Sequence, residues 1–465
     1  MIPLRVRELV ESTRGVLLNG TDTTKISGIS IDSRTIKGGE LFIPLKGNGD
    51  GHQFIQDALV AGAAGVLVEK EASNKEYYLS LVGSQCVIEV GDTLKALQAI
   101  ATHYRKKLSV KVIGITGSTG KTTTKDMLNC VLAYKMRVIS TDKNYNNEIG
   151  VPLTILRADE KTQAMVVEMA MRGPGQIREL ADIAQPDIGI VTNIGQAHIE
   201  LLGSEEATAF AKAELIEAIP EDGVVVLNAD DLWTSDIAQR AHGRVVTYGI
   251  MEGDVKGNKI EVDELGKAKF SLTVNNGSAY TVRLPIPGRH NVYNALAVAA
   301  AATAVGLTPD DIRIGLSNCR TSAMRMEIFA LDENMLILND AYNANPTSMQ
   351  AALATLMDVR TKGRHIAVLG DMLELGRVSN EAHKQVGEIV ASLGVSILVA
   401  VGEESQVMAD SALKSGMNQK TVITCPDADT AAQLLRQLIE PGDVVLVKAS
   451  RGMGLEAVVR TLVKI

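Results

Sequence analysis

The strongest chemical signal in the sequence is a glycine-rich segment, Gly114-Ile-Thr-Gly-Ser-Thr-Gly-Lys-Thr-Thr123. A continuous apolar run, Lys111–Thr116, enters it, and a stretch with helical periodicity, Thr122–Tyr134, leaves it. Glycines let a backbone approach phosphate oxygens, and a helix N-terminus offers free N–H groups to anions. The residues predicted to bind a nucleotide phosphate are Gly117, Ser118, Thr119, Gly120, Lys121, Thr122 and Thr123.

This segment is a variant of the usual phosphate-binding loop. The strict pattern G-x-x-x-x-G-K-T fails because Ile115 stands at its first glycine, and the tighter G-x-x-G-K-T is present instead. An isolated Gly-Lys-Thr can be an incidental turn. Because strand, loop and helix agree here, the pattern favours phosphate binding, with Lys121 as its cation and the Thr122 hydroxyl placed for Mg²⁺.

Two polar residues follow predicted strands of the same region. Glu168 ends the apolar strand Ala164–Met169, and open α/β sheets place ligand groups at such carboxyl ends. It is either a Mg²⁺ ligand or a solvated acid at a sheet edge. His198 lies beyond the predicted strand Ile188–Thr192 and a glycine-containing loop, where a metal or nucleotide role competes with a structural one.

Lys212 lies in a predicted helix, Glu205–Ala218, on the same face as Ala209, Ile216 and Ile219. A lysine on an apolar face must extend its ammonium to solvent, find a partner or change its chemistry. One such change is reaction of a lysine of depressed pKa with CO₂. The resulting carbamate would be a carboxylate-like ligand for Mg²⁺.

Length and composition limit the architecture that must position these residues. A chain of 465 residues predicts about three domains, and 46% hydrophobic with 22% charged residues is a globular composition. Strands alternating with helices predict α/β domains with a doubly wound, mostly parallel central sheet. We expect domains at 1–108, 109–322 and 323–465. A helix, Phe54–Gly65, is expected within the first domain, and a β-rich segment, Tyr248–Leu284, and an alanine-rich helix, Asn291–Val305, within the second.

Charge and cysteine content exclude several function classes. The balance of 47 basic and 55 acidic residues contains no basic block, which argues against nucleic acid as the main partner. The sequence has no run of about 18 apolar residues and no leader pattern, so we expect a cytoplasmic protein without membrane insertion. The widely spaced Cys86, Cys130, Cys319 and Cys425 predict reduced, buried thiols rather than a zinc site.

Over essentially its whole length the sequence resembles the Mur ligases, whose phosphate loop has the same tight form. The resemblance implies ATP and Mg²⁺ as cofactors, with the metal held by Thr122, Glu168, His198 and a carbamate on Lys212. It implies catalytic roles for Lys121, Lys212, His198 and Glu168. It also implies a small N-terminal α/β domain for a UDP-linked substrate, a central phosphate-loop domain and a Rossmann-like C-terminal domain.

Further segments imply how nucleotide and substrate are bound. Pro287–Ala297 resembles an adenine-contacting segment, which implicates Asn291 and Asn294. Arg325 resembles an arginine that reaches the nucleotide from the third domain, although Met324 precedes it where relatives usually have glycine. The remaining implied roles are ATP ribose for Asp340, the base for Tyr342, and the UDP-linked substrate for Ser33, Arg34, Asn146 and Asn147.

Less widely shared motifs indicate the branch of the family. Asn144–Pro152, Asn339–Pro346 and Leu369–Gly376 resemble the branch that adds D-alanyl-D-alanine to UDP-N-acetylmuramoyl-tripeptide through an acyl phosphate, in peptidoglycan precursor synthesis. Lys448–Gly452 resembles a segment beside the active-site cleft. The resemblance also implies a monomer.

Other functions remain as alternatives. A ligase adding the third peptide residue would carry an Asp-Asn-Pro-Arg motif, which is absent, and the segment Asp32-Ser-Arg34 argues against a folyl-polyglutamate-type enzyme. A binding module that has kept the fold is a second class, although the cysteine-rich zinc ribbon of amidating relatives is missing. A non-ligase P-loop ATPase is the third, and it leaves the N-terminal domain unexplained.

Overall fold

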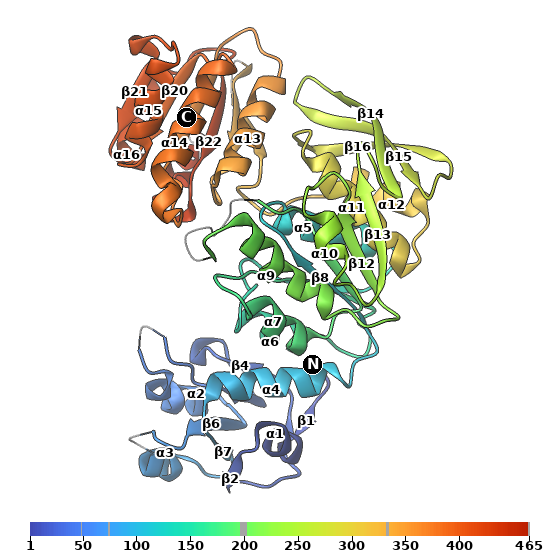
Figure 1. Cartoon of the computed structure of the whole chain (residues 1–465). Coiled ribbons are helices and arrows are strands. Elements are labelled where there is room, and N and C mark those ends of the chain that lie inside the picture. Colours follow the sequence, from blue (N-terminus) through green and yellow to red (C-terminus); the bar gives the residue numbers. More distant parts are fainter. Residues whose placement is uncertain (48, 73–74, 196–201, 332–333, 464–465) are drawn as a thin grey trace. The chain divides into compact units, whose positions relative to one another are not determined.

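The computed structural model describes residues 1–47, 49–72, 75–195, 202–331 and 334–463, and Figure 1 labels its elements. The chain divides into two compact units. Unit 1 comprises Met1–Gly114, Met136–Met171 and Gln176–Asp187, whereas unit 2 comprises Ile115–Lys135, Arg172–Gly175 and Ile188–Ile465. Strand β8 (Lys111–Thr116) therefore begins in unit 1 and ends in unit 2.

The N-terminal part of unit 1 is a small α/β layer. Its elements are β1 (Leu4–Arg5), α1 (Val6–Thr13), β2 (Val16–Asn19), β3 (Lys25–Ile26), β4 (Gly28–Ser30), η1 (Ser33–Thr35), β5 (Glu40–Phe42), η2 (Gly51–Phe54), α2 (Ile55–Val60), β6 (Gly65–Glu69), α3 (Lys75–Leu81), β7 (Cys86–Val90) and α4 (Thr93–Arg105). Five strands form a sheet in the order β2-β7-β6-β5-β4, in which only β2 runs antiparallel to its neighbour. Phe42, Ile55, Val66 and Val87 belong to its buried apolar core.

The rest of unit 1 consists of β9 (Val138–Ser140), α6 (Gly150–Leu156), β10 (Ala164–Glu168) and α7 (Gln176–Ala184). Strands β9 and β10 pair in parallel. All five residues of β10 are buried, which explains why this strand reads as an apolar run that ends in a carboxylate. Arg105 at the end of α4 donates from Nε to the carbonyl of Ala184 at 2.8 Å and so ties α4 to the end of α7.

Unit 2 begins with the elements that surround the glycine-rich loop. They are α5 (Lys121–Ala133), β11 (Ile188–Val191), α9 (Glu205–Glu217), β12 (Val224–Asn228), α10 (Thr234–Ala238), β13 (Arg244–Gly249), β14 (Val255–Val262), β15 (Lys267–Val274), β16 (Ala279–Pro287), α11 (Asn291–Val305) and α12 (Pro309–Ser317). Strands β11, β12, β13 and β14 pair with one another in parallel, and β14, β15 and β16 form an antiparallel meander (Figure 1). The meander confirms the predicted β-rich segment.

A second sheet occupies the C-terminal part of unit 2, with strand order β17-β18-β22-β19-β20-β21. Its elements are β17 (Glu327–Ala330), β18 (Leu336–Asn339), α13 (Pro346–Asp358), β19 (His365–Gly370), η4 (Gly376–Val378), α14 (Ser379–Ser392), β20 (Ile397–Val401), α15 (Ser405–Lys414), η5 (Gln419–Thr421), β21 (Val422–Cys425), α16 (Ala428–Leu438), β22 (Val444–Lys448), η6 (Arg451–Met453) and α17 (Glu456–Val463). Only the edge strand β17 is antiparallel to its neighbour. The mostly parallel α/β class predicted from the sequence is confirmed.

The bounds predicted for single strands and helices can be compared with the observed ones. Strand Lys111–Thr116 and helix Asn291–Val305 have the predicted bounds, and Gly306 closes the helix with a left-handed φ of 99°. The helix predicted at Phe54–Gly65 is shorter than expected, because a 3₁₀ turn precedes it and Gly62 takes a φ of 97°.

The four thiols are free, and three of them are buried. The prediction of a buried thiol is wrong for Cys130 in α5, which is half-buried and whose Sγ lies 3.8 Å from the Arg320 carbonyl oxygen. In the described part of the chain, no helix is both long and apolar enough to cross a membrane.

Candidate active site

The glycine-rich loop joins β8 to α5, and two of its glycines are required by close neighbours. Gly117 has a φ of 147°, and a Cβ there would lie 1.8 Å from Thr192 Oγ1. Gly120 has a φ of 76°, and a Cβ there would lie 2.4 Å from Asn294 Oδ1. Gly120 is also the N-cap of α5 and brings no side chain to the helix N-terminus. The first N–H groups of α5 therefore remain suited to anionic oxygens.

Asn193, two residues after the end of β11, braces this loop. Its backbone carbonyl accepts from Ser118 N, and its Oδ1 accepts from Thr119 N, both at 2.9 Å. Its Nδ2 donates to the Thr119 carbonyl at 3.2 Å. The Asn193 side chain therefore binds both the N–H and the carbonyl group of Thr119 and holds the loop backbone in place.

Lys121, Thr122, Arg325 and Tyr342, all predicted as nucleotide-binding, lie in unit 2. Lys121 Nζ donates to the Gly117 carbonyl at 2.7 Å, so the cation folds back over the loop. Arg325 Nη2 donates to Thr122 Oγ1 at 2.9 Å, and its guanidinium lies 4.0 Å from the centre of the Tyr342 ring. Such stacking holds an arginine flat against an aromatic face.

The backbone around Arg325 is strained. Met324 and Met326 have φ values of 60° and 51°, a left-handed region that costs about 1 kcal/mol for a residue with a Cβ. Met326 N donates to Asp340 Oδ1 at 3.1 Å, which helps to hold the turn. Met324 therefore takes the conformation for which glycine is suited, and the difference from relatives noted in the sequence does not displace Arg325 from Thr122.

Lys212 is buried within α9, with 1% of its surface exposed, so the alternative of an ammonium extended to solvent is wrong. Its three predicted face neighbours, Ala209, Ile216 and Ile219, are buried as well. Burial, and secondarily the charge of Lys121, holds the pKa of Lys212 well below its usual value. Within the described residues, the structure gives Lys212 no ion pair. A neutral amine is therefore favoured at this position.

Asn291 and Asn294, at the start of α11, form a relay. Asn291 Nδ2 donates to the Pro287 carbonyl at 2.6 Å, and Asn294 Nδ2 donates to Asn291 Oδ1 at 2.8 Å. Asn294 Oδ1 accepts from the Thr124 hydroxyl at 3.3 Å. The two amides thus connect the start of α11 to α5, beside Gly120.

Asp340 follows β18, and each of its two carboxylate oxygens accepts a hydrogen bond, Oδ1 from Met326 N and Oδ2 from Lys448. Lys448 Nζ, at the end of β22, donates to Asp340 Oδ2 at 2.6 Å and to the Asn343 carbonyl at 2.8 Å. The adjacent parallel strands β18 and β22 bring these residues to one sheet edge. Sequence reasoning placed Lys448 beside a cleft but did not foresee this pairing, since the two positions are 108 residues apart.

Glu168 and Asn146 meet in unit 1. Asn146 Nδ2 donates to Glu168 Oε1 at 2.9 Å, while Glu168 Oε2 is buried without a hydrogen-bond partner in the described part of the chain. A buried, unsatisfied carboxylate oxygen is costly unless a cation binds it. Asn147 has another task, because its Oδ1 accepts from the backbone N–H groups of Ile149 and Gly150 where α6 begins.

Ser33 and Arg34, the other predicted substrate residues, lie in the 3₁₀ turn η1. Ser33 is buried, whereas Arg34 is exposed and donates from Nε and Nη2 to the two carboxylate oxygens of Asp32. The hydrogen bond from the Arg34 side chain is the main reason that the pKa of Asp32 falls to about 2. His198 lies outside the described residues.

Clusters of acidic, histidine or cysteine side chains are the usual protein sites for a cation. Among the residues that the structure describes, no group of three or more His, Cys, Asp or Glu side chains could hold a metal ion. Oxygen donors of the kind that Mg²⁺ prefers are the Thr122 hydroxyl in unit 2 and, in unit 1, the buried Glu168 oxygen that lacks a hydrogen-bond partner within the described residues.

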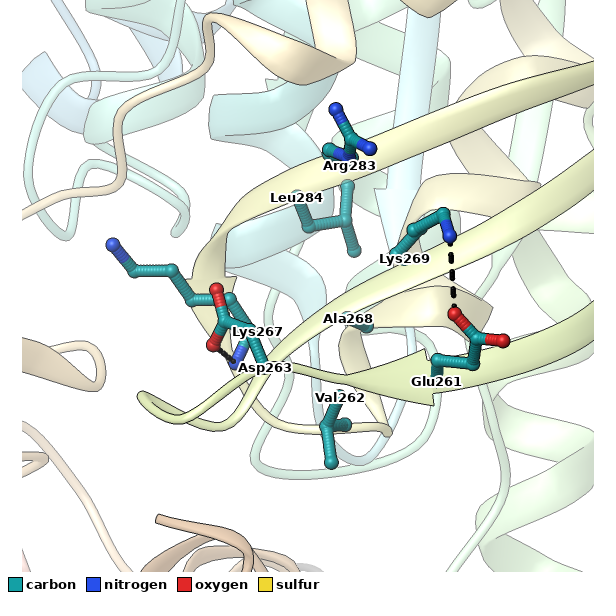
Figure 2. A pocket seen from close by; sticks show the side chains of 8 residues that line it. All are labelled: Glu261, Val262, Asp263, Lys267, Ala268, Lys269, Arg283 and Leu284. Atoms are coloured by element: carbon teal, nitrogen blue, oxygen red, sulfur yellow. Dashed lines mark hydrogen bonds and ion pairs between the residues drawn. The ribbon is translucent and has the colours of Figure 1, made fainter. Parts of the chain in front are cut away.

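A hollow on the meander is a separate feature. Strands β14, β15 and β16 line it, and Figure 2 shows the residues involved: Glu261, Val262, Asp263, Lys267, Ala268, Lys269, Arg283 and Leu284. Lys269 Nζ pairs with Glu261 Oε2 at 3.1 Å, and Asp263 Oδ1 accepts from Lys267 N at 2.9 Å. These acidic groups are engaged in holding the hairpin, so the hollow is a structural feature rather than a second reaction centre.

Comparison with known proteins identifies the family. Three family profiles match the chain in order: Mur ligase family, catalytic domain, at residues 25–105; Mur ligase middle domain at 115–302; and Mur ligase, glutamate ligase domain, at 324–451. The UDP-N-acetylmuramoyl-tripeptide–D-alanyl-D-alanine ligase of Bacillus subtilis is 38% identical over 100% of this chain and 99% of its own length. The chain belongs to the Mur ligase family.

Solved structures resemble this Mur ligase over its length. MurF from Acinetobacter baumannii has a TM-score of 0.90 at 30% identity, covering 100% of this chain and 99% of that protein. MurF from Thermotoga maritima, solved in complex with ADP, has a TM-score of 0.82 at 29% identity, covering 94% and 97%. The predicted three-domain Mur ligase architecture is confirmed.

Sequence reasoning on this Mur ligase missed Asn193, although a signal was available. Asn193 lies two residues beyond the buried strand β11, at the carboxyl end where sheets of this class gather ligand-binding groups. Its neighbour Thr192, which donates to the Thr119 carbonyl at 2.6 Å, was missed for the same reason. The position of these two residues could be recognised from the sequence, but their contacts with the loop, more than 70 positions away, could not.

Proposed function

We propose that this Mur ligase adds D-alanyl-D-alanine to UDP-N-acetylmuramoyl-tripeptide, consuming ATP and forming ADP, in the synthesis of peptidoglycan precursors. The full-length similarity to ligases named for that reaction supports the substrates. The observation that carries ATP dependence is the meeting of Arg325 with Thr122 at the end of the glycine-rich loop. A loop cation, a helix N-terminus and an arginine from another domain together suit a polyphosphate.

The nucleotide has a consistent set of partners. The seven loop residues, Gly117 to Thr123, would hold the phosphates through N–H groups and Lys121. Arg325 would face the same phosphates from the C-terminal side. Tyr342, already stacked on Arg325, supplies an aromatic face for the base, and Asp340 a carboxylate for the ribose hydroxyls. Asn291 and Asn294 would act near the adenine, within the relay that reaches α5.

Mg²⁺ is the metal that suits hydroxyl, carboxylate and carbamate oxygens, to which His198 would add a ring nitrogen. Thr122, Glu168, His198 and carbamylated Lys212 would hold it, and the buried Glu168 Oε2 is the observation that favours a cation. When bound, the ion offsets negative charge on the phosphate oxygens. The depressed pKa of Lys212 supports the carbamate, because only a neutral amine reacts with CO₂.

The reaction needs no protein nucleophile. The terminal carboxylate of the tripeptide attacks the γ-phosphorus of ATP, the bond to the bridging oxygen breaks, and ADP leaves. The amine of D-alanyl-D-alanine then attacks the acyl carbon, and inorganic phosphate departs from the tetrahedral intermediate as the amine loses a proton. Lys121 reduces the repulsion between the attacking carboxylate and the phosphate.

The remaining roles concern the substrate and the setting. We assign Ser33 and Arg34 to the uridine diphosphate and Asn146 and Asn147 to the rest of the UDP-linked substrate, in domains bounded at 1–108, 109–322 and 323–465. Asn147 would do so from its place just before α6, where its Oδ1 accepts from Gly150 N. The use of ATP and a UDP-linked precursor favours a cytoplasmic enzyme, and we propose that it acts as a monomer.

Phosphate release tests the proposal directly. The enzyme is incubated with Mg-ATP and UDP-N-acetylmuramoyl-tripeptide, carrying either lysine or diaminopimelate, with and without D-alanyl-D-alanine. We expect phosphate release that requires both substrates and a UDP-linked pentapeptide by mass spectrometry. Release that does not depend on the dipeptide would indicate a simple ATPase, and no release with both substrates present would indicate a ligase for another acceptor. Either result would contradict the proposal.

A further inference from the structure

The linker, residues 320–326, lies between α12 and β17 and runs along one face of α5. The α5 side chains that contact it are spaced four residues apart: Thr122, Asp126 and Cys130. Residues at this spacing lie above one another on a helix, so the three form a single stripe. Their partners follow in the reverse order of the chain: Arg325, Ser322 and Arg320. The linker therefore runs antiparallel to the helix that starts at the phosphate loop.

Asp126 makes the central contact, and both of its carboxylate oxygens are engaged. Oδ1 pairs with Lys125 Nζ at 2.8 Å, and only 11% of the Asp126 side chain and 4% of the Lys125 side chain are exposed. Oδ2 accepts from Ser322 N at 2.7 Å. A hydrogen bond to an ionised acceptor is stronger than one between neutral groups, and shielding from water strengthens it further. Asp126 therefore fixes the middle of the linker to α5.

The contacts on either side of Asp126 hold the linker less firmly. Cys130 Sγ lies 3.8 Å from the Arg320 carbonyl oxygen, and a thiol is a weak donor. Arg325 donates to the Thr122 hydroxyl, which is also the group placed for Mg²⁺. The Nε of Arg325 is buried and has no hydrogen-bond partner among the described residues. Arg325 therefore retains a donor for an anionic oxygen, and its position depends on the linker residues before it.

The end of the linker is held by the C-terminal sheet instead. Met324 N donates to Glu327 Oε2 at 3.2 Å, and Met326 N donates to Asp340 Oδ1 at 3.1 Å. Glu327 begins β17, and Asp340 follows β18. These bonds place Arg325 relative to the sheet, whereas the bond from Ser322 N to Asp126 places the linker backbone relative to α5.

We propose that Asp126 is a positioning residue of the reaction, which fixes the linker on α5 so that Arg325 points at the phosphates held by the glycine-rich loop. This inference rests on the proposed function, in which Arg325 faces those phosphates. Asp126 lies one helical turn beyond Thr122 and acts through Ser322 N rather than on the nucleotide itself. An arginine that is already in place need not be ordered during the reaction, so its full effect on the developing charge is available.

Steady-state kinetics of Asp126→Ala and Asp126→Asn tests the assignment. Alanine removes the acceptor of the Ser322 N–H, and loss of a hydrogen bond to a charged group predicts kcat/KM for ATP lowered by about tenfold or more. Asparagine keeps an acceptor oxygen, so its loss should stay within about threefold. The KM values for the dipeptide and the UDP-tripeptide should change by less than about twofold in both variants. An asparagine variant as impaired as the alanine variant would overturn the proposal, as would normal ATP kinetics in Asp126→Ala.

Ser322 offers a matched pair of variants that leave Asp126 and Lys125 in place. Ser322→Pro removes the N–H donor, whereas Ser322→Ala keeps it. We expect Ser322→Pro to lower kcat/KM for ATP as Asp126→Ala does, and Ser322→Ala to stay within about twofold of the unaltered enzyme. This pair also decides the matter if Asp126→Ala does not fold. Equal kcat/KM values for ATP in the two Ser322 variants would contradict the proposal.

A double-mutant cycle with Arg325→Met distinguishes positioning from a general structural effect. If Asp126 acts through Arg325, Asp126→Ala should lower kcat/KM for ATP by less than about twofold when Arg325 is already replaced. A purely structural role would lower it by the same factor in both backgrounds, and that result would exclude the proposal. Asp310→Ala is the control, because it removes an exposed carboxylate paired with Arg313 at 2.8 Å in α12 and should leave ATP kinetics unchanged.

The unaltered enzyme distinguishes this inference from the proposed function. If it makes no dipeptide-dependent product from ATP and the UDP-tripeptide, the proposed function fails. If it makes the pentapeptide while Asp126→Ala and Ser322→Pro retain normal ATP kinetics, only the positioning role of Asp126 fails.

Discussion

Arg325 donates a hydrogen bond to the hydroxyl of Thr122 at 2.9 Å, although the two residues are 203 positions apart in the chain. Thr122 lies in the first turn of α5, and Arg325 precedes the first strand of the C-terminal sheet. The contact links the phosphate loop to the segment that leads into the third domain. Nucleotide binding and the position of that segment are therefore expected to be coupled.

Replacing Arg325 by lysine should distinguish the contribution of its positive charge from that of its planar guanidinium group. Lysine keeps a positive charge but cannot both stack on Tyr342 and donate to Thr122 from a planar group. We expect kcat/KM for ATP to fall by roughly 10²-fold, a typical loss for a donor aimed at developing charge. ADP formation with both substrates present measures it. Arg320→Lys, on the exposed segment just before, serves as the control, and an equal loss there would contradict the assignment.

Lys212 offers a prediction about covalent chemistry. Its burial and the nearby Lys121 favour a neutral amine, so ¹³C-bicarbonate should label it as a carbamate. We expect a carbamate carbon resonance in the unaltered enzyme that is absent from Lys212→Met, together with activity reduced by about 10²-fold or more. Lys135→Met, on the surface at the end of α5, should keep the resonance. A resonance that persists in Lys212→Met would place the carbamate elsewhere.

Asn193 should be sensitive to replacement of its amide by a carboxylate. Asn193→Asp keeps an acceptor for Thr119 N–H but loses the donor to the Thr119 carbonyl and places an anion beside the phosphates. The KM for ATP should rise by about tenfold or more, because a buried charged contact is worth about 1.5–3 kcal/mol. ATP titration under saturating UDP-tripeptide measures this change. An unaltered KM would mean that Asn193 does not brace the nucleotide loop.

The pair Arg364–Asp443 should make the C-terminal domain acid-sensitive. Burial opposes ionisation of Asp443, but hydrogen bonds from the Arg364 side chain and from the Glu440 and Arg364 N–H groups prevail, so its pKa is lowered. A carboxyl of lowered pKa adds stability above its unfolded pKa of about 3.9, and that stability disappears as the pH falls through the folded value.

Arg364→Met tests this linkage. It leaves Asp443, 1% exposed, without its cation, and we expect the Tm of the C-terminal transition at pH 7 to fall by roughly 5–10 °C. The difference from the unaltered chain should narrow below about pH 4, as Asp443 becomes protonated. Differential scanning calorimetry across pH measures it, with Arg436→Met on the exposed side of α16 as the control. A Tm difference independent of pH would contradict the linkage.

Local chemistry explains which elements could be predicted. Strand Lys111–Thr116 was predictable because a strand buried on both faces is a continuous apolar run. Helix Asn291–Val305 was predictable because consecutive alanine-rich residues form a helical pattern. The predicted helix Phe54–Gly65 was too long because the pattern did not reveal that Gly62 would adopt a left-handed conformation. The role of a single residue such as Glu168 could be predicted from its place at a strand end. Its hydrogen-bond partner could not be predicted in the same way.

By itself the sequence determined the phosphate loop, the α/β class and the family resemblance, since each is encoded in neighbouring residues whose types and spacing suffice. Only the tertiary structure decided that Arg325 meets Thr122, that Lys448 pairs with Asp340, and that Lys212 is buried rather than extended to solvent. The physical reason is that these outcomes depend on which strand ends and helix faces become neighbours. Burial then sets the charge state and hydrogen-bond partners of each group, and no local pattern carries that information.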